Sequence, residues 1–292
     1  MELKKATRKQ VKLRLGLAAP SGGGKTASAL LLAYGMTNDW EKIALIDSEN
    51  ESGSLYADFK LPTTSQTIGQ FLTLPISAPF TPAKYIEAIK ACEDAGMQVI
   101  IIDSITHEWS GKGGCLDMHE KIVEKISNPN SYTAWAKITP QHQAFIDAIL
   151  QSKCHVITTV RSKTEYVMTE RNGKQVPQKM GMAAVTREGF EYELSVAFDI
   201  DINHRAIASK DRTGLFMDNT PEIITIETGK KILQWCESGA AAEAKPETKP
   251  SLNDNQFKKI IARVQSGESE LKEKARLNFT LTTEQVSELQ SA

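Results

Sequence analysis

Residues 11–34 read VKLRLGLAAPSGGGKTASALLLAY, and this stretch decides the fold. Apolar residues alternate as far as Leu17, which is typical of a strand. Small and turn residues follow, and a helical pattern begins near Thr26. A strand, a glycine-rich loop and a helix in this order are the setting in which a loop wraps a phosphate. The stretch therefore predicts an α/β protein organised around a phosphate-binding turn.

Positions 19–26 follow the pattern G-x-x-x-x-G-K-[ST], with a small alanine in place of the first glycine. The glycines can take positive φ and turn backbone N–H groups toward a phosphate, and the dipole of the following helix favours the same anion. Lys25 would reach the β- and γ-phosphates, and the Thr26 hydroxyl would bind Mg²⁺. The predicted cofactors are therefore ATP and Mg²⁺, and the predicted nucleotide-binding residues are Ala19, Pro20, Ser21, Gly22, Gly23, Gly24, Lys25, Thr26 and Ala27.

Two further apolar runs end in an aspartate. Residues 99–103 read VIIID, the most apolar run of the chain, which is typical of the Walker B strand of P-loop proteins. Asp103 is therefore predicted to hold Mg²⁺ through water, together with Thr26. Residues 43–47 read IALID and predict a second buried parallel strand. The loop SENESGS that follows would lie at the carboxyl edge of the sheet, where ligands bind in open α/β folds.

Composition limits the class of protein without naming it. A chain of 292 residues suggests one large or two small domains, and a net charge of −1 argues neither for nor against nucleic acid. The chain has no apolar signal segment and no run of 18 apolar residues, so we expect a cytoplasmic protein that does not span a membrane. The cysteines show no C-x-x-C and no histidine at metal spacing, and are expected to be reduced and mostly buried; they are Cys92, Cys115, Cys154 and Cys236.

The order of patterns predicts three parts: an ATPase domain over residues 1–239, a low-complexity linker over 240–250 and a small helical tail over 251–292. Within the first part we expect a helix from Pro82, a glycine-rich loop over 105–114 and a helix beginning at Thr139-Pro140. Further expected elements are a strand over 154–160, a hairpin over 164–180, and tail helices near 254–266 and 283–290.

With these motifs in order, residues 4–238 resemble the RecA-like ATPase core, and more closely the AAA-domain ATPases of bacteriophages and prophages, including those grouped with Sak-type single-strand annealing proteins. The resemblance implies an α/β P-loop core with a mainly parallel central sheet flanked by helices. It also implies Mg²⁺-dependent ATP hydrolysis, self-assembly as a ring or filament, and a role in DNA recombination or replication in the bacterial host cell.

Catalytic roles follow from the same resemblance. Glu49 takes the role of general base, with Glu51 as the competing candidate. Lys210 and Arg212, in the segment K-D-R-T-G, match cations that a neighbouring subunit offers to the γ-phosphate. Asp211, an acid between the two cations, departs from the pattern. The predicted catalytic residues are Lys25, Glu49, Asp103, Lys210 and Arg212.

The resemblance also places DNA contacts in two loops, residues 104–114 and 161–179. The second carries an excess of cations that could neutralise the phosphates of single-stranded DNA, and a solvated hairpin with ordinary charges is an equal alternative. The candidate DNA-binding residues are Arg161, Lys163, Lys174 and Lys179. Phage single-strand binding or recombination proteins are further possible partners.

Other classes of P-loop protein remain open. The chain lacks the L-S-G-G-Q signature of ABC ATPases and the N-K-x-D motif that binds guanine, which favours ATP over GTP. A small-molecule P-loop kinase would use Arg161 and Lys163 to grip phosphate and would transfer it to an acceptor. A non-enzymatic ATP-binding scaffold is the third alternative, and it would be indifferent to the loss of Glu49.

Overall fold

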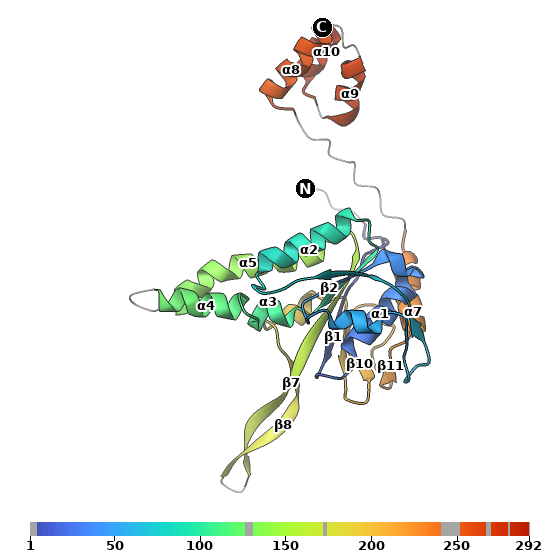
Figure 1. The fold of residues 1–292 in the computed structure, drawn as a ribbon, viewed down its shortest axis with the longest axis vertical. Coiled ribbons are helices and arrows are strands. Elements are labelled where there is room, and N and C mark those ends of the chain that lie inside the picture. The colour runs from blue at the N-terminus through green and yellow to red at the C-terminus, as the bar shows by residue number, and fades with distance from the viewer. Residues whose placement is uncertain are drawn as a thin grey trace. The chain divides into compact units, whose positions relative to one another are not determined.

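The computed structural model describes residues 5–125, 131–171, 174–240, 252–266, 270–279 and 281–291 (Figure 1). These fall into two compact units, Met1–Ala240 and Ala241–Ala292. The strands of the first unit are β1 (Arg14–Ala19), β2 (Ile43–Asp47), β3 (Phe59–Lys60), β4 (Thr67–Ile68), β5 (Leu72–Pro75), β6 (Val99–Asp103), β7 (His155–Arg171), β8 (Lys174–Ala184), β9 (Val196–Ile200), β10 (Arg205–Asp211) and β11 (Glu222–Ile223). The central sheet has the order β11-β10-β9-β1-β7-β6-β2-β5, with β8 paired to β7.

The core of the sheet is parallel. β1 pairs in parallel with both β7 and β9, and β6 pairs in parallel with β7 and β2, whereas β10 runs antiparallel to β9. Every residue of β2 and β6 is buried. A strand that is covered on both faces consists of consecutive apolar residues. This explains the sequences IALID in β2 and VIIID in β6.

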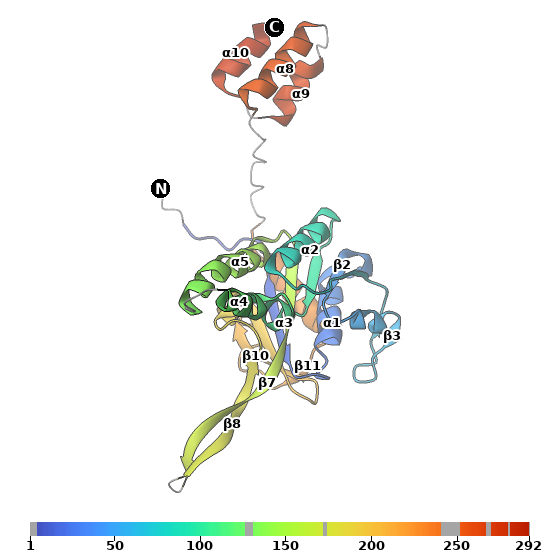
Figure 2. The same ribbon diagram turned by 60° about the vertical axis from the view of Figure 1, so that its left-hand side comes forward.

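Helices cover both faces of the sheet (Figures 1 and 2). Side chains of α1 (Lys25–Thr37) and α7 (Ile226–Glu237) belong to the apolar cluster on one face, and those of α2 (Pro82–Asp94) and α5 (Ser131–Gln151) to the cluster on the other. The predicted fold class, an α/β protein with a mainly parallel central sheet flanked by helices, is therefore confirmed. α2 begins as expected, with the Thr81 hydroxyl accepting a hydrogen bond from the backbone N–H of Lys84 at 3.3 Å.

α1 and α7 approach each other closely at two glycines. A Cβ on Gly229 would lie 2.3 Å from the carbonyl oxygen of Leu32, and a Cβ on Gly35 would lie 2.1 Å from that of Ile226. No side chain fits at such distances, so glycine at both positions lets the helix that follows the phosphate-binding turn pack directly against α7.

Two segments between residues 105 and 151 differ from the sequence prediction, at α3 and at the start of α5. The expected loop over 105–114 contains a short helix, α3 (Thr106–Ser110), and α4 (Cys115–Glu124) follows it. α5 begins at Ser131 and runs through Pro140, where we expected it to start. A proline inside a helix removes one backbone hydrogen bond. The helix continues because apolar residues on both sides of the proline, such as Ile138 and Phe145, are buried.

The expected strand over 154–160 and the hairpin that follows it are one continuous element. β7 leaves the sheet and pairs with β8 as a long two-stranded ribbon that extends away from the core (Figure 1). No glycine or proline occurs between His155 and Arg171 to end the strand. The strand that begins in the core is therefore the same strand that builds the projecting hairpin.

The second unit is a small bundle of α8 (Asp254–Gln265), α9 (Glu270–Asn278) and α10 (Thr283–Ser291) around its own apolar core. The first and third helices match the two that the sequence predicts, and α9 is an additional helix between them. Along the described residues, no helix combines the length and the apolar composition needed to cross a membrane.

Candidate nucleotide-binding site

The glycine-rich turn lies at the carboxyl end of β1 and leads directly into α1. Gly22 and Gly24 have φ of 78° and 88°, in the left-handed region that favours glycine. Gly23 differs, because a Cβ there would lie 2.8 Å from the Cβ of Ala19. Gly22 and Gly24 are thus required by the backbone conformation of the turn, and Gly23 is required because a side chain there would clash with Ala19. The Lys25 amine folds over the turn and donates hydrogen bonds to the carbonyls of Ala19 and Pro20, at 3.3 and 3.2 Å.

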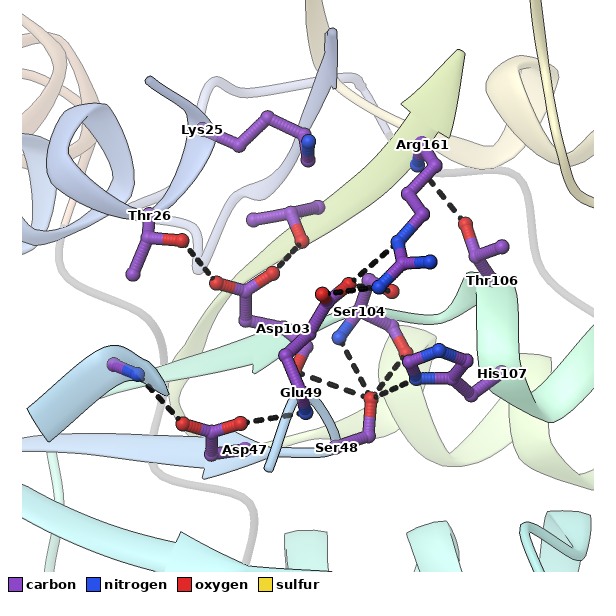
Figure 3. A network of polar contacts seen from close by, with 12 residues as sticks. Lys25, Thr26, Asp47, Ser48, Glu49, Asp103, Ser104, Thr106, His107 and Arg161 are labelled. Carbon is purple, nitrogen blue, oxygen red and sulfur yellow. Dashed lines mark hydrogen bonds and ion pairs between the residues drawn. The ribbon is translucent and has the colours of Figure 1, made fainter. Parts of the chain in front are cut away.

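Asp103 lies beside the first turn of α1, the position expected for a Walker B aspartate. Its two oxygens accept hydrogen bonds from the hydroxyls of Thr26 and Thr159, each at 2.5 Å (Figure 3). Burial raises the pKa of the Asp103 carboxyl, although both hydroxyls act in the opposite direction. A buried carboxylate next to a threonine hydroxyl and a phosphate-binding turn is a donor set that fits Mg²⁺, which prefers oxygen ligands and one or two carboxylates.

A second aspartate shapes the loop after β2. Asp47 accepts hydrogen bonds from the backbone N–H groups of Glu49, at 2.6 Å, and Gly53, at 2.8 Å. These two bonds fold the loop back over the end of the strand. They turn the Glu49 side chain toward the end of β6, where its carboxylate accepts a hydrogen bond from the Ser104 hydroxyl at 3.0 Å. Glu51, the competing candidate, is exposed.

Arg161 binds the Glu49 carboxylate with two hydrogen bonds (Figure 3). Its Nε donates to Oε1 at 2.9 Å, and its Nη2 donates to Oε2. Burial alone would raise the pKa of Glu49, but the hydrogen bonds and charge of Arg161 outweigh it and hold the pKa below its ordinary value. The structure therefore places Arg161, a candidate DNA-binding residue, in contact with the candidate general base.

Further polar side chains join the ends of β2 and β6. The Ser48 hydroxyl accepts from the backbone N–H of Ser104 at 2.9 Å and lies 2.8 Å from Nδ1 of His107 (Figure 3). Thr106 accepts from the backbone N–H of Arg161 at 2.9 Å. Sequence reasoning did not assign Ser48, His107 or Thr106 a role. Their position directly after strands that end in aspartate was the available signal.

A pocket of about 270 Å³ opens beside the phosphate-binding turn. Gly22, Gly24, Tyr56 and His204 are among the residues that line it. A Cβ on Gly24 would lie 3.1 Å from Nδ1 of His204, so the imidazole lies against the turn. Neither Tyr56 nor His204 belongs to a sequence motif, and both reach the turn through the fold.

Lys210 and Arg212 lie at the edge of the sheet where β1 and β9 begin, whereas Lys25 lies at the opposite edge, where β1 ends. β10 runs antiparallel to β9, and its last residue, Asp211, stands opposite Val196 at the start of β9. Lys210 donates to the carbonyl oxygen of Glu191 at 2.8 Å, and Arg212 to that of Tyr192 at 2.8 Å. The structure therefore does not bring these two cations to the phosphate-binding turn of the same chain.

The remaining candidate DNA contacts belong to the projecting hairpin. Lys163 lies on β7 and is exposed. Lys174 and Lys179 lie on β8, and their side chains fall outside the described residues.

A parallel sheet with a glycine-rich turn, Lys25 and Thr26 at one strand end and a buried aspartate at another defines a P-loop nucleotide-binding protein. The AAA domain family matches residues 11–233. The chain belongs to this family of P-loop ATPases, which confirms the ATPase class predicted from the motifs.

Comparison with solved structures finds a likeness to a KaiC-like protein from the hyperthermophilic archaeon Pyrococcus horikoshii OT3. The two share 14% sequence identity with a TM-score of 0.39, over 72% of this chain and 84% of that one. No curated protein matches the chain.

Proposed function

We propose that this protein hydrolyses ATP with Mg²⁺, assembles with copies of itself, and acts on single-stranded DNA in phage recombination, single-strand annealing or replication. The observation that carries the hydrolytic part is the register of β2 and β6. Asp47 pairs with Asp103 in the sheet. Glu49, two residues after Asp47, therefore lies beside the candidate metal ligand Asp103 and accepts a hydrogen bond from Ser104. A base, a metal ligand and a P-loop lysine then share one edge of the sheet.

Each side chain has a distinct task in this proposal. Lys25 and the backbone amides of the turn bind the β- and γ-phosphates, while Thr26 and Asp103 hold Mg²⁺, which neutralises charge that develops on the phosphate oxygens. Glu49 accepts a proton from the water that attacks the γ-phosphorus in line. To do so the carboxylate must give up at least part of its pairing with Arg161, which is then free to face the γ-phosphate.

The position of Lys210 and Arg212 supports self-assembly. Both cations lie at the edge opposite their own phosphate-binding turn, so one chain would contribute them to the site of the next. Such cations stabilise the transition state by several kcal/mol in related phosphoryl transfers, which is a fold-change of about 10³ or more. Hydrolysis by separate chains would accordingly be slow.

The hairpin of β7 and β8 supports contact with single-stranded DNA. It projects from the sheet as a ribbon that carries Lys163, Lys174 and Lys179 in its sequence, and cations of this kind can track a phosphate backbone. β7 also carries Arg161 at its base, so the proposed DNA contact and the proposed catalytic pair share one strand. We place the protein in the cytoplasm of a bacterial host, encoded by a phage or prophage.

Steady-state ATP hydrolysis tests the proposal, measured with and without single-stranded DNA over a range of protein concentrations and at two salt concentrations. We expect a rate that rises more than linearly with protein, increases with DNA and loses the DNA effect at high salt. A rate of hydrolysis that does not change when DNA is added would contradict the proposed role on DNA. Transfer of phosphate only to an added acceptor would favour the small-molecule kinase. No turnover of ATP would favour the ATP-binding scaffold.

A mixing experiment tests the shared site. Lys25→Ala protein and Arg212→Ala protein should each be inactive alone. Their mixture should recover part of the activity, because some interfaces then join an Arg212→Ala subunit, whose phosphate-binding turn is intact, to a Lys25→Ala subunit, whose arginine is intact. Lys90→Ala, which removes an exposed charge on α2, is the matched control and should keep full activity. No recovery at any mixing ratio removes the assignment of Arg212 to a neighbouring chain.

A further inference from the structure

Three side chains that metals favour meet inside the first unit, outside the phosphate-binding turn. Glu108 comes from α3, Cys115 is the first residue of α4, and His142 lies in the middle of α5. Among the residues that the structure describes, they are the one group of three or more such side chains whose ligand atoms lie within 4.8 Å of one another. We propose that Glu108, Cys115 and His142 form a zinc site that ties the three helices together.

The distances between the three ligand atoms fit one small cation. Sγ of Cys115 lies 3.1 Å from Oε1 of Glu108 and 3.8 Å from Nδ1 of His142, and the latter two atoms are 3.0 Å apart. A point equidistant from three atoms so spaced lies about 2 Å from each, close to zinc–nitrogen and zinc–oxygen bond lengths. A small outward shift of Cys115 gives the slightly longer zinc–sulfur bond. Carboxylate, imidazole and thiolate together are a donor set that zinc takes readily.

Burial distinguishes this group from an ordinary surface cluster. Glu108, Cys115 and His142 are 1%, 0% and 4% exposed. A carboxylate this deep needs a hydrogen-bonded or positive partner, and Oε1 of Glu108 lies 3.0 Å from Nδ1 of His142. The rings of Trp109 and Phe145 pack against His142, with centroids 5.5 and 6.4 Å away, and shield the group from water. A bound cation would supply the positive charge that so dry a site requires.

Local backbone structure holds the ligands at this spacing. Gly113 has φ of 80°, and a Cβ on Gly114 would lie 2.5 Å from the carbonyl oxygen of Glu108. These glycines let the chain turn tightly from α3 into α4, so that Cys115 comes back against Glu108 only seven residues later. His142 is 27 residues further on. The spacing matches no short metal motif, which is why the sequence showed no histidine at metal spacing.

One of the three proposed ligands, His142, borders a pocket. His142 lines a pocket of about 200 Å³ together with Thr139, Gln143, Arg187, Glu188 and Glu193. Zinc with three protein ligands commonly binds water in the fourth position. Under the proposal, a cation would enter by way of His142, and that water would lie on the His142 side of the group.

Zinc here would fix α3 next to the nucleotide site. Glu108 directly follows His107, whose ring stacks on Phe80 at 5.0 Å and lies 2.8 Å from the Ser48 hydroxyl. The ligands do not touch the phosphate-binding turn, so the proposed metal has a structural task and is separate from the Mg²⁺ of hydrolysis.

The competing account is a hydrogen-bonded triad without metal, in which the Cys115 thiol donates to Glu108. Elemental analysis of the full-length protein, grown with added zinc and freed of loose metal by gel filtration, separates the two. We expect close to one zinc per chain, falling at least tenfold in Cys115→Ser and in His142→Gln. Cys92→Ser, which changes a buried cysteine on α2, is the matched control and should keep its zinc.

Cobalt provides a readout on the unmodified chain, so the result does not depend on whether the variants fold. Protein stripped with a chelator and loaded with Co²⁺ should show tetrahedral d–d bands and a thiolate-to-cobalt charge-transfer band, and Cys115→Ser should lose the latter. Wild-type protein with native circular dichroism but neither bound zinc nor these cobalt bands would overturn the proposal and leave the hydrogen-bonded triad.

Discussion

Asp47 and Asp103 end neighbouring strands and pair in the sheet, yet they should respond in opposite ways to replacement by asparagine. The partners of Asp47 are two backbone N–H groups, which can only donate hydrogen bonds. The partners of Asp103 are two hydroxyls, which can rotate and accept instead. An asparagine amide at position 103 would therefore find partners for both its oxygen and its nitrogen, whereas the same amide at position 47 would not.

The magnitudes follow from these partners. Asp47→Asn sets an N–H₂ group against a backbone N–H, and leaving such buried donors unpaired costs about 1–3 kcal/mol of unfolding free energy. For Asp103, burial raises the pKa in the folded state, so the folded chain keeps this proton to higher pH than the unfolded chain. Stability is then lost as pH rises through that window, and the ionised carboxylate is a net cost at neutral pH. Asp103→Asn should keep or raise the unfolding free energy.

Urea denaturation at neutral pH without nucleotide, paired with ATP hydrolysis, measures both effects. Asp103→Asn should lower hydrolysis by about 10²-fold or more, because the proposed metal ligand and its charge are lost, while its denaturation midpoint stays at or above that of the wild type. Asp47→Asn should shift the midpoint down. If Asp103→Asn is destabilised as much as Asp47→Asn, or hydrolyses ATP at the wild-type rate, the reasoning about this site is wrong.

Three further predictions test other parts of the first unit. Glu49→Gln should lower hydrolysis by about 10²–10⁴-fold with little change in nucleotide affinity by calorimetry, and an unchanged rate would remove its role as base. Burial lowers the pKa of His155 to about 3, so the unfolded chain binds the proton first and stability should fall as pH drops from about 6.5 toward 3. His155→Asn, which can still accept the hydrogen bond from the N–H of Leu13, should flatten that loss in acid denaturation curves; an unchanged acid limb would contradict this. Gly229→Ala should cost about 1–3 kcal/mol, seen as a lower melting temperature, because its Cβ meets the Leu32 carbonyl; a gain in stability, as helix propensity alone predicts, would refute the close packing.

The parts of the site that could be predicted are those whose chemistry lies in adjacent residues. The turn at positions 19–26 carries its own glycines, lysine and threonine, so composition and order suffice to identify it. Asp103 could be found because a strand buried on both faces is a continuous apolar run, and the first charge after such a run marks its end.

The parts that could not be predicted depend on contacts between distant residues. Glu49 and Arg161 are 112 positions apart and meet because β2, β6 and β7 lie next to one another in the sheet. The sequence predicts a DNA contact for Arg161 as readily as a contact with Glu49, because sequence alone does not show where a guanidinium points. Pro140 misled the prediction of α5 because local propensity favours a helix start there, whereas burial on both sides of the proline carries the helix through.

Lys210 and Arg212 show how a single reversal of strand direction bears on the proposed assembly. Had β10 run parallel to β9, its carboxyl end would have reached the same edge as the phosphate-binding turn, and the two cations could have served their own chain. Because β10 is antiparallel, it carries them to the start of β9 instead. Under the proposed function, Lys210 and Arg212 must then serve the site of another copy. A rate per chain that stays constant on dilution would therefore argue against both the role of these residues and the assembly that it requires.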